Sequence, residues 1–204
     1  MTTALWMSLM DTKEETMVNE GNLVWIDLEM TGLSIKDCTI IEIATIITNA
    51  ELEVVAEGPD LVVHQATELL DAMDAWNTSH HGKSGLTQAV KDSQIDMATA
   101  EAQTLEFIKK YVPKGVSPLC GNSVHNDRVF LDKFMPDLAG YVHYRNIDVS
   151  TIKELARRWY GNQIMPPKKG AHRALDDIVE SIEELRHYRA KVFRSSLEDG
   201  APGS

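Results

Sequence analysis

Short apolar segments separated by turn-forming residues occupy the first third of the chain. They lie at 23–28 (LVWIDL), 39–48 (TIIEIATIIT), 52–57 (LEVVAE) and 61–64 (LVVH), and all are rich in β-branched residues. Segments of this length and composition, with turns between them, predict an antiparallel meander of three strands.

Helical spacing replaces this pattern after residue 64. Apolar residues recur at intervals of three and four over 69–76 and again over 98–108, which predicts two helices. Trp76 falls on the apolar stripe of the first of these helices, where packing in the core is its expected role.

Strands and helices alternate in the second half of the chain. The predicted strands span 118–120 and 145–149, and the predicted helices span 126–134, 151–159 and 172–193, the last of them after a loop at 166–170. A meander followed by alternating strands and helices predicts an α/β fold, in which helices flank a mixed sheet of antiparallel and parallel strands.

The composition is that of one globular domain. Of the 204 residues 43% are hydrophobic, enough for one sizeable core. We expect this domain at 22–193, with flexible tails at 1–21 and 194–204. Two isolated cysteines favour a reducing compartment. No secretory signal is visible in the sequence, and no apolar run approaches the ~20 residues of a membrane span. A cytoplasmic location is expected, or a mitochondrial one if a transit peptide has been removed.

The charge balance limits the partners. The chain carries 31 acidic against 20 basic residues, a formal net charge of -11. A protein that follows a long duplex nucleic acid needs a basic face, for which this chain has no surplus of Lys and Arg. Small substrates, or short oligomers held at one point, remain compatible with the charge.

Two carboxylates stand at the end of the first predicted strand. Asp27 and Glu29 are two residues apart, so in a strand they point to the same face, where like charges resist joint ionisation unless a cation intervenes. One alternative is that both are solvated turn residues before Thr31 and Gly32. Another is an aspartyl-phosphate phosphotransferase loop with Asp27 as the nucleophile, although Glu at the second position weakens it.

Two further acidic segments follow the later strands. Asp127 is expected in the first turn of a helix that begins after the strand at 118–120, at the edge where ligands of α/β sheets bind. His172 and Asp177 are five residues apart at the start of the last helix, with Asp176 about 100° away around its axis. Stabilisation of a helix N-terminus explains these acids equally well, and a capping or surface position explains His172.

Four carboxylates at one sheet edge would call for hard divalent cations. Oxygen ligands without thiols favour Mg²⁺ or Mn²⁺ over zinc. The sequence contains none of the motifs of zinc proteases, serine hydrolases, P-loop NTPases or dinucleotide-binding enzymes.

Four segments together resemble the oligoribonucleases, in the DEDDh branch of the RNase H-like 3′-to-5′ exonucleases. They are WIDLEMTGL at 25–33, GNSVHNDRVFLDKFMP at 121–136, HYRNIDVSTIKELARRW at 143–159 and HRALDDI at 172–178. The similarity extends over about 22–193 and implies an RNase H-like five-stranded sheet. It implies a homodimeric enzyme that hydrolyses short RNA, chiefly 5′-phosphorylated dinucleotides, to 5′-mononucleotides.

The resemblance also implies the roles of individual residues. Two Mg²⁺ or Mn²⁺ ions would be held by Asp27, Glu29, Asp127 and Asp177, and His172 would be the general base. Leu33 and Trp76 would contact the two bases. The 5′ phosphate would be capped by Ser123, Arg145, Ser150 and Thr151, and the site completed by His81 and by Tyr144 of the second subunit. From their positions alone, Ser123, Ser150 and Thr151 also fit helix caps.

Two other functions remain open. One is a DNA-acting proofreading exonuclease of the same fold, and the other is a non-catalytic nucleotide-binding protein. The presence of all four acids and His172 argues against the second, since a protein that had lost catalysis would usually lack at least one of them.

Overall fold

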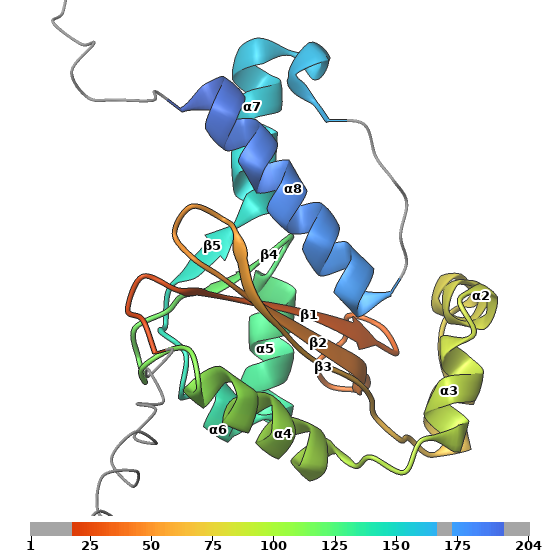
Figure 1. The fold of residues 1–204 in the computed structure, drawn as a ribbon. Helices are drawn as coiled ribbons and strands as arrows, with labels where there is room; N and C mark the ends of the chain where they lie inside the picture. Colours follow the sequence, from red (N-terminus) through yellow and green to blue (C-terminus); the bar gives the residue numbers. More distant parts are fainter. Residues whose placement is uncertain (1–17, 167–172, 194–204) are drawn as a thin grey trace, which may run out of the picture.

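A five-stranded mixed sheet forms the centre of the protein in a computed structural model that describes residues 18–166 and 173–193 (Figure 1). The strand order is β3-β2-β1-β4-β5; the pairs β1/β2 and β2/β3 are antiparallel, and β1/β4 and β4/β5 are parallel. The predicted α/β fold with a mixed sheet is therefore confirmed. The strands are β1 (Leu23–Met30), β2 (Ile40–Thr48), β3 (Val54–Val62), β4 (Leu119–Gly121) and β5 (Asn146–Asp148).

Helices connect and cover these strands. They are α1 (Thr67–Asp71), α2 (Ala75–Lys83), α3 (Leu86–Asp92), α4 (Met97–Lys109), α5 (His125–Phe134), α6 (Pro136–Ala139), α7 (Val149–Tyr160), η1 (Asn162–Ile164) and α8 (Ala174–Val192). Within the described ranges, no helix is long and apolar enough to cross a membrane. Of the tails predicted at 1–21 and 194–204 and the loop predicted at 166–170, residues 1–17, 194–204 and 167–170 lie outside the described residues.

The predicted segments 52–57 and 61–64 belong to one strand, β3, because the turn-type residues between them, Gly58 and Pro59, lie within the strand. A Cβ on Gly58 would lie 2.5 Å from the Phe107 ring, so glycine is needed here for the close approach of α4 to the sheet. Pro59 is tolerated because β3 is an edge strand.

The helix predicted at 69–76 is two helices, and this changes the position of Trp76. α1 ends at Asp71, and Asp74 caps a new helix, α2, by accepting a hydrogen bond from the backbone N–H of Asn77 at 2.8 Å. Trp76 lies in the first turn of α2 with 67% of its surface exposed. The expectation that Trp76 packs in the core is wrong, because the new helix does not continue the apolar phase of the first.

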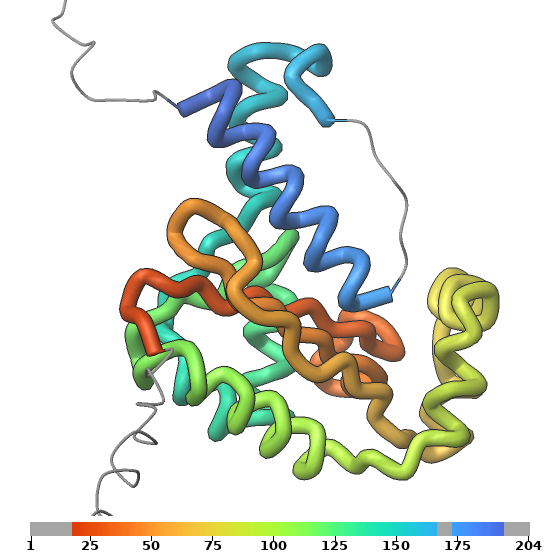
Figure 2. The backbone as a smooth tube through the Cα atoms, viewed as in Figure 1, coloured from red at the N-terminus to blue at the C-terminus, as the bar shows by residue number. Residues whose placement is uncertain are grey.

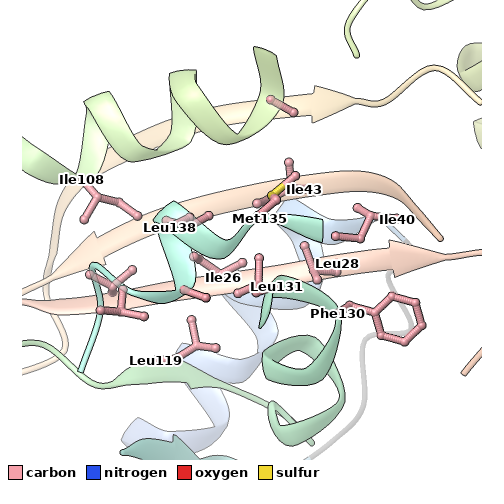
Figure 3. Packing of buried hydrophobic residues seen from close by; sticks show 14 of the residues in the cluster. Ile26, Leu28, Ile40, Ile43, Ile108, Leu119, Phe130, Leu131, Met135 and Leu138 are labelled. Carbon is pink, nitrogen blue, oxygen red and sulfur yellow. The ribbon is translucent and has the colours of Figure 1, made fainter. Parts of the chain in front are cut away.

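The two faces of the sheet are covered by different helices. Ile26 and Leu28 of β1 point toward Leu131 and Met135 in the core beneath α4, α5 and α6 (Figure 3). Trp25 packs in the apolar cluster on the opposite face. The backbone of α7 and α8 runs over that face (Figure 2). Because side chains alternate along a strand, Asp27 and Glu29 share the face of Trp25 and lie toward α8.

Candidate active site

Three carboxylates from β1 and α8 meet on this face of the sheet. Oxygen atoms of Asp27, Glu29 and Asp177 lie within 4.8 Å of one another, and we call these three residues the carboxylate group. β1 continues to Met30, so Asp27 and Glu29 belong to the strand, and the alternative that they are turn residues is wrong. Asp177 lies in the first turn of α8, half-buried, whereas its neighbour Asp176 is exposed.

Asp127 approaches the same place from the other side of β1. It lies in the first turn of α5, is 5% exposed, and accepts a hydrogen bond from the Leu28 backbone N–H at 3.0 Å. This bond fixes its carboxylate against the strand that carries Asp27. The parallel pairing of β1 with β4 brings the start of α5 to this edge, as the sequence predicted.

Burial and mutual repulsion govern the ionisation of these acids. Burial first, and then the charges of Asp127 and Glu29, hold the pKa of Asp27 well above its ordinary value. Burial first, and then Asp177, raise the pKa of Glu29 to about 8, and burial raises the pKa of Asp127 to about 7. The four acids therefore cannot all be charged at neutral pH without added positive charge. Buried oxygen donors that repel one another fit a site for hard divalent cations.

Glu42 is a fifth acid on the same face, which the sequence analysis assigned no role. It lies on fully buried β2 directly across from Glu29, and it forms an ion pair with the guanidinium of Arg173, whose Nε lies 2.8 Å from Oε1. Its other oxygen accepts from the Ala174 N–H at 3.3 Å. Glu42 thus fastens the start of α8 to the sheet and so positions Asp177. The signal in the sequence was the one acid that interrupts the apolar run at 40–47.

His172, the expected general base, lies outside the described residues. The residue that follows it, Arg173, is held by Glu42.

An exposed apolar pair lies beside Glu29. Leu33 is 69% exposed and Trp76 is 67% exposed, and both line a cavity of about 430 Å³ together with Glu29. The ring of His80 stacks on Trp76 at 4.5 Å. His81 is buried beneath, with Nε2 3.0 Å from the Met30 carbonyl oxygen, and burial lowers the pKa of its imidazole.

Three of the four residues expected to cap a phosphate lie together, joined by Asp148. Ser123 Oγ and Ser150 Oγ are 3.1 Å apart, and Asp148 accepts from Ser123 N–H at 2.8 Å and from Thr151 Oγ1–H at 2.6 Å. We call these four residues the polar cluster. Asp148 occupies the N-cap position of α7, so Ser150 and Thr151 are not its cap residues. No spacing pattern in the sequence indicates that Asp148 joins these residues.

Asn122 lies between the polar cluster and the cavity that the carboxylate group borders. Asn122 Oδ1 accepts from Ser150 Oγ at 3.0 Å, and Asn122 lines a cavity of about 230 Å³ with Asp27 and Asp177. The polar cluster is therefore separated from this cavity by one residue, Asn122.

Arg145 and Tyr144 lie at the approach to β5 and are exposed. Tyr144 is 76% exposed, and the guanidinium of Arg145 lies 5.5 Å from the centre of its ring. Within the described part of the chain, this guanidinium forms no hydrogen bond with the polar cluster.

Comparison with known proteins places the chain in a family. The family model described as exonuclease (RNase_T) matches residues 24–185. The oligoribonuclease of Hydrogenovibrio crunogenus is 58% identical over 178 residues, which cover 87% of this chain and 97% of that protein. That of Pseudomonas aeruginosa is 59% identical over 174 residues, or 85% and 97% of the two chains. The chain belongs to the oligoribonuclease family.

A human relative carries a compartment in its name. The human protein named mitochondrial oligoribonuclease is 52% identical over 179 residues, covering 87% of this chain and 76% of that protein. As a member of the oligoribonuclease family with an exonuclease domain, the chain is a nuclease and therefore a hydrolase.

Solved structures confirm the fold of this oligoribonuclease-family chain. Exonuclease I of Methylocaldum szegediense matches with a TM-score of 0.65 at 16% identity, over 84% of this chain and 41% of that one. E. coli exonuclease I in complex with a dA16 oligonucleotide matches with a TM-score of 0.67 at 14% identity, again over 84% and 41%. This chain spans less than half the length of those proteins, and the likeness concerns the fold alone.

Proposed function

We propose that this chain is a 3′-to-5′ exoribonuclease that hydrolyses short RNA, chiefly 5′-phosphorylated dinucleotides, to 5′-mononucleotides. The observation that carries the proposal is the carboxylate group, whose oxygen atoms lie within 4.8 Å of one another beside buried Asp127. Hydrolysis of a phosphodiester develops negative charge, and a site that gathers divalent cations suits that reaction.

Asp27, Glu29, Asp127 and Asp177 would hold two Mg²⁺ or Mn²⁺ ions. Bound ions supply the positive charge that offsets both the four carboxylates and the reacting phosphate. The Leu28 N–H keeps Asp127 oriented, and Glu42, acting through Arg173 and Ala174, keeps α8 and its Asp177 against β1. We assign the general base to His172 on the sequence, because a neutral imidazole near its ordinary pKa of about 6.5 can accept a proton from the attacking water.

Leu33 and Trp76 would hold the two bases. Both side chains are exposed and both border the cavity of Glu29, and an exposed apolar patch beside a cavity is typical of a binding site. Stacking of a base on an aromatic ring contributes about 1–3 kcal/mol and accepts any base, which suits an enzyme for mixed short RNA. His81, below the same cavity, would complete the base and sugar contacts.

Ser123, Ser150 and Thr151 would cap the 5′ phosphate together with Arg145. A cap at this end limits substrate length, because a longer chain would have to continue through the space that the cap occupies. The net charge of -11 gives the same preference, since no broad basic surface is available to follow a long strand.

We further propose a homodimer in which Tyr144 of the partner subunit reaches the site. Its 76% exposure leaves the ring available for such a contact. The compartment stays a prediction, cytoplasmic or mitochondrial.

The decisive experiment measures mononucleotide release from a 5′-phosphorylated RNA dinucleotide. We expect release with Mg²⁺ or Mn²⁺, none with EDTA, and a higher kcat/KM for the dinucleotide than for RNA of five or more residues. A matched deoxyribo-dinucleotide and a long DNA strand test the alternative of a DNA-acting exonuclease. Equal kcat/KM for dinucleotide and longer RNA would overturn the length preference, and faster DNA cleavage would overturn the ribonuclease assignment.

A further inference from the structure

Two adjacent histidines on α2 face Glu29 at the end of β1. Ring nitrogens of His80 and His81 and a carboxylate oxygen of Glu29 all lie within 4.8 Å of one another. We propose that Glu29, His80 and His81 form a separate metal site that takes Zn²⁺. We call these three residues the histidine site; it shares Glu29 with the carboxylate group but differs from it in donor type.

His81 provides the decisive detail. Its Nε2 lies 3.0 Å from the Met30 carbonyl oxygen, which can only accept, so Nε2 carries the proton and Nδ1 presents a lone pair. Nδ1 is buried and, within the described ranges, has no hydrogen-bond partner, while the residue is 1% exposed. It lies 3.9 Å from Glu29 Oε2. A lone pair buried opposite a carboxylate oxygen is unfavourable unless a cation lies between the two atoms.

His80 supplies the third ligand on a supported ring. It stacks on Trp76 with the ring planes 13° apart and meets His81 edge-on with centroids 5.4 Å apart. Stacking reduces the freedom that the ring would lose on binding a metal, and the half-buried position leaves the site open on one side. Two imidazoles and one carboxylate with a fourth open position form a donor set typical of zinc.

The distance between Glu29 and His81 is close to that of two ligand atoms on zinc, and the His80 nitrogen lies within 4.8 Å of both. Tetrahedral bonds to nitrogen and oxygen put neighbouring ligand atoms ~3.3 Å apart, so Glu29 and His81 must approach by about half an ångström. Small side-chain rotations suffice, because Oε2 and Nδ1 already face each other at 3.9 Å. Nitrogen donors favour Zn²⁺ over Mg²⁺, whereas the carboxylate group has oxygen donors only.

Sharing Glu29 has a functional consequence that rests on the proposed function. A Zn²⁺ ion in the histidine site takes Glu29 from the carboxylate group and lies next to Trp76. Zn²⁺ therefore inhibits Mg²⁺-dependent hydrolysis, and higher Mg²⁺ relieves the inhibition.

The site itself is tested without any activity assay. The full chain is stripped with a chelator and titrated with Zn²⁺ while long-range ¹H–¹⁵N NMR follows the ring nitrogens of its seven histidines. We expect the signals of His81 Nδ1 and of one His80 ring nitrogen to shift together. In His80→Gln the Zn²⁺ dissociation constant rises by about tenfold or more, whereas His64→Gln, the same change at an exposed histidine that contacts the Val90 carbonyl, leaves it unchanged.

Two results would overturn the proposal. One is saturation by Zn²⁺ with the His80 and His81 signals unmoved, and the other is equal Zn²⁺ affinity in His80→Gln and wild type. If His80→Gln fails to fold, as judged by its NMR spectrum, Glu29→Gln removes a different ligand and must weaken Zn²⁺ binding in the same way. An inhibition assay then asks whether His80→Gln raises the inhibitory Zn²⁺ concentration by the same factor. If the chain cleaves no RNA, the NMR titration still decides the metal site.

Discussion

Glu29 and Glu42 are opposite each other on β1 and β2, yet their surroundings differ completely. Glu42 is fully buried and has a cation and a backbone N–H of α8 as partners. Glu29 lies next to Asp27 and Asp177, and the nearby Arg173 lowers its pKa less than burial and the neighbouring acids raise it. Of these two carboxylates on one sheet face, the protein neutralises Glu42 with its own groups and leaves Glu29 for a ligand.

The difference shows how to distinguish structural from functional acids at a sheet edge. A buried carboxylate whose partners come from the same chain stabilises the fold, and its loss leaves a charge without a partner. A carboxylate among other carboxylates destabilises the protein without metal, and its loss relieves repulsion. Mutations at the two positions should therefore change stability in opposite directions.

Asp27→Asn should give the largest effect. Losing one of four metal ligands should lower metal-dependent cleavage of an RNA dinucleotide at least about 10³-fold. In the metal-free protein at pH 8, the same change should raise Tm, because one repelling charge is gone. Asp176→Asn, at the exposed neighbour of Asp177, is the control and should keep near wild-type turnover. Turnover of Asp27→Asn above a few per cent of wild type would remove Asp27 from the metal site.

Glu42→Ala should change stability in the other direction. It leaves Arg173 and the Ala174 N–H without their partner and should lower the free energy of unfolding by about 3 kcal/mol, near the lower end for a broken buried pair because Arg173 is 36% exposed. Urea unfolding measures this value. Glu42→Gln keeps a hydrogen-bond acceptor and should lose less. A loss that added Mn²⁺ fully restores would instead place Glu42 among the metal ligands.

The pH dependence of stability should reveal the unneutralised acids. The pKa of Glu29 is about 8 and that of Asp127 about 7 in the folded chain, against ordinary values of 4.5 and 3.8. Between about pH 5 and pH 8 the unfolded chain has released these protons and the folded chain retains them, so stability falls as pH rises. Without metal we expect a loss of several kcal/mol across this window, since each retained proton contributes about 1.4 kcal/mol per pH unit.

Chemical denaturation at several pH values, with EDTA and with Mn²⁺, measures this slope. Mn²⁺ should abolish it, because bound cations favour the ionised carboxylates. The variant Asp27→Asn should flatten it in the metal-free protein. A metal-free stability that rises from pH 5 to pH 8 would contradict raised pKa values at these positions.

Much of the fold followed from local pattern. β2 was predicted from a β-branched apolar run between turn residues and α4 from apolar residues at helical spacing. Asp127 could be placed in the first turn of its helix because a strand and a helix are adjacent in the chain. Trp76 was misplaced because a cap at Asp74 begins a new helix, and the sequence period does not show that the helical phase restarts there. Gly58 was likewise interpreted as a turn residue. Its actual role, close packing against Phe107, depends on a tertiary contact that the local sequence does not show.

Less of the candidate site than of the fold could be predicted from the sequence. The i, i+2 spacing identified Asp27 and Glu29 as one pair, whereas the choice of Asp177 over Asp176 as their partner came from the resemblance to a family. Nothing local indicated that Arg173 would pair with Glu42, 131 residues away, or that Asp148 would bind the N–H of Ser123. Such partners depend on which elements the sheet order brings together.

Ser150→Ala should give the smallest effect and leave the metal site untouched. The change removes the hydroxyl that donates to Asn122 and accepts from Ser123, and with it one hydrogen bond to the proposed 5′ phosphate. A hydrogen bond to a charged group is worth about 1.5–3 kcal/mol, and part of this is recovered by water, so KM for a 5′-phosphorylated RNA dinucleotide should rise about tenfold with kcat little changed. The same dinucleotide without its 5′ phosphate should lose little, and the Mg²⁺ concentration for half-maximal activity should stay constant. Equal losses on both substrates would show that Ser150 supports α7 rather than the phosphate, whereas a shifted Mg²⁺ requirement would show that the polar cluster and the carboxylate group act as one unit.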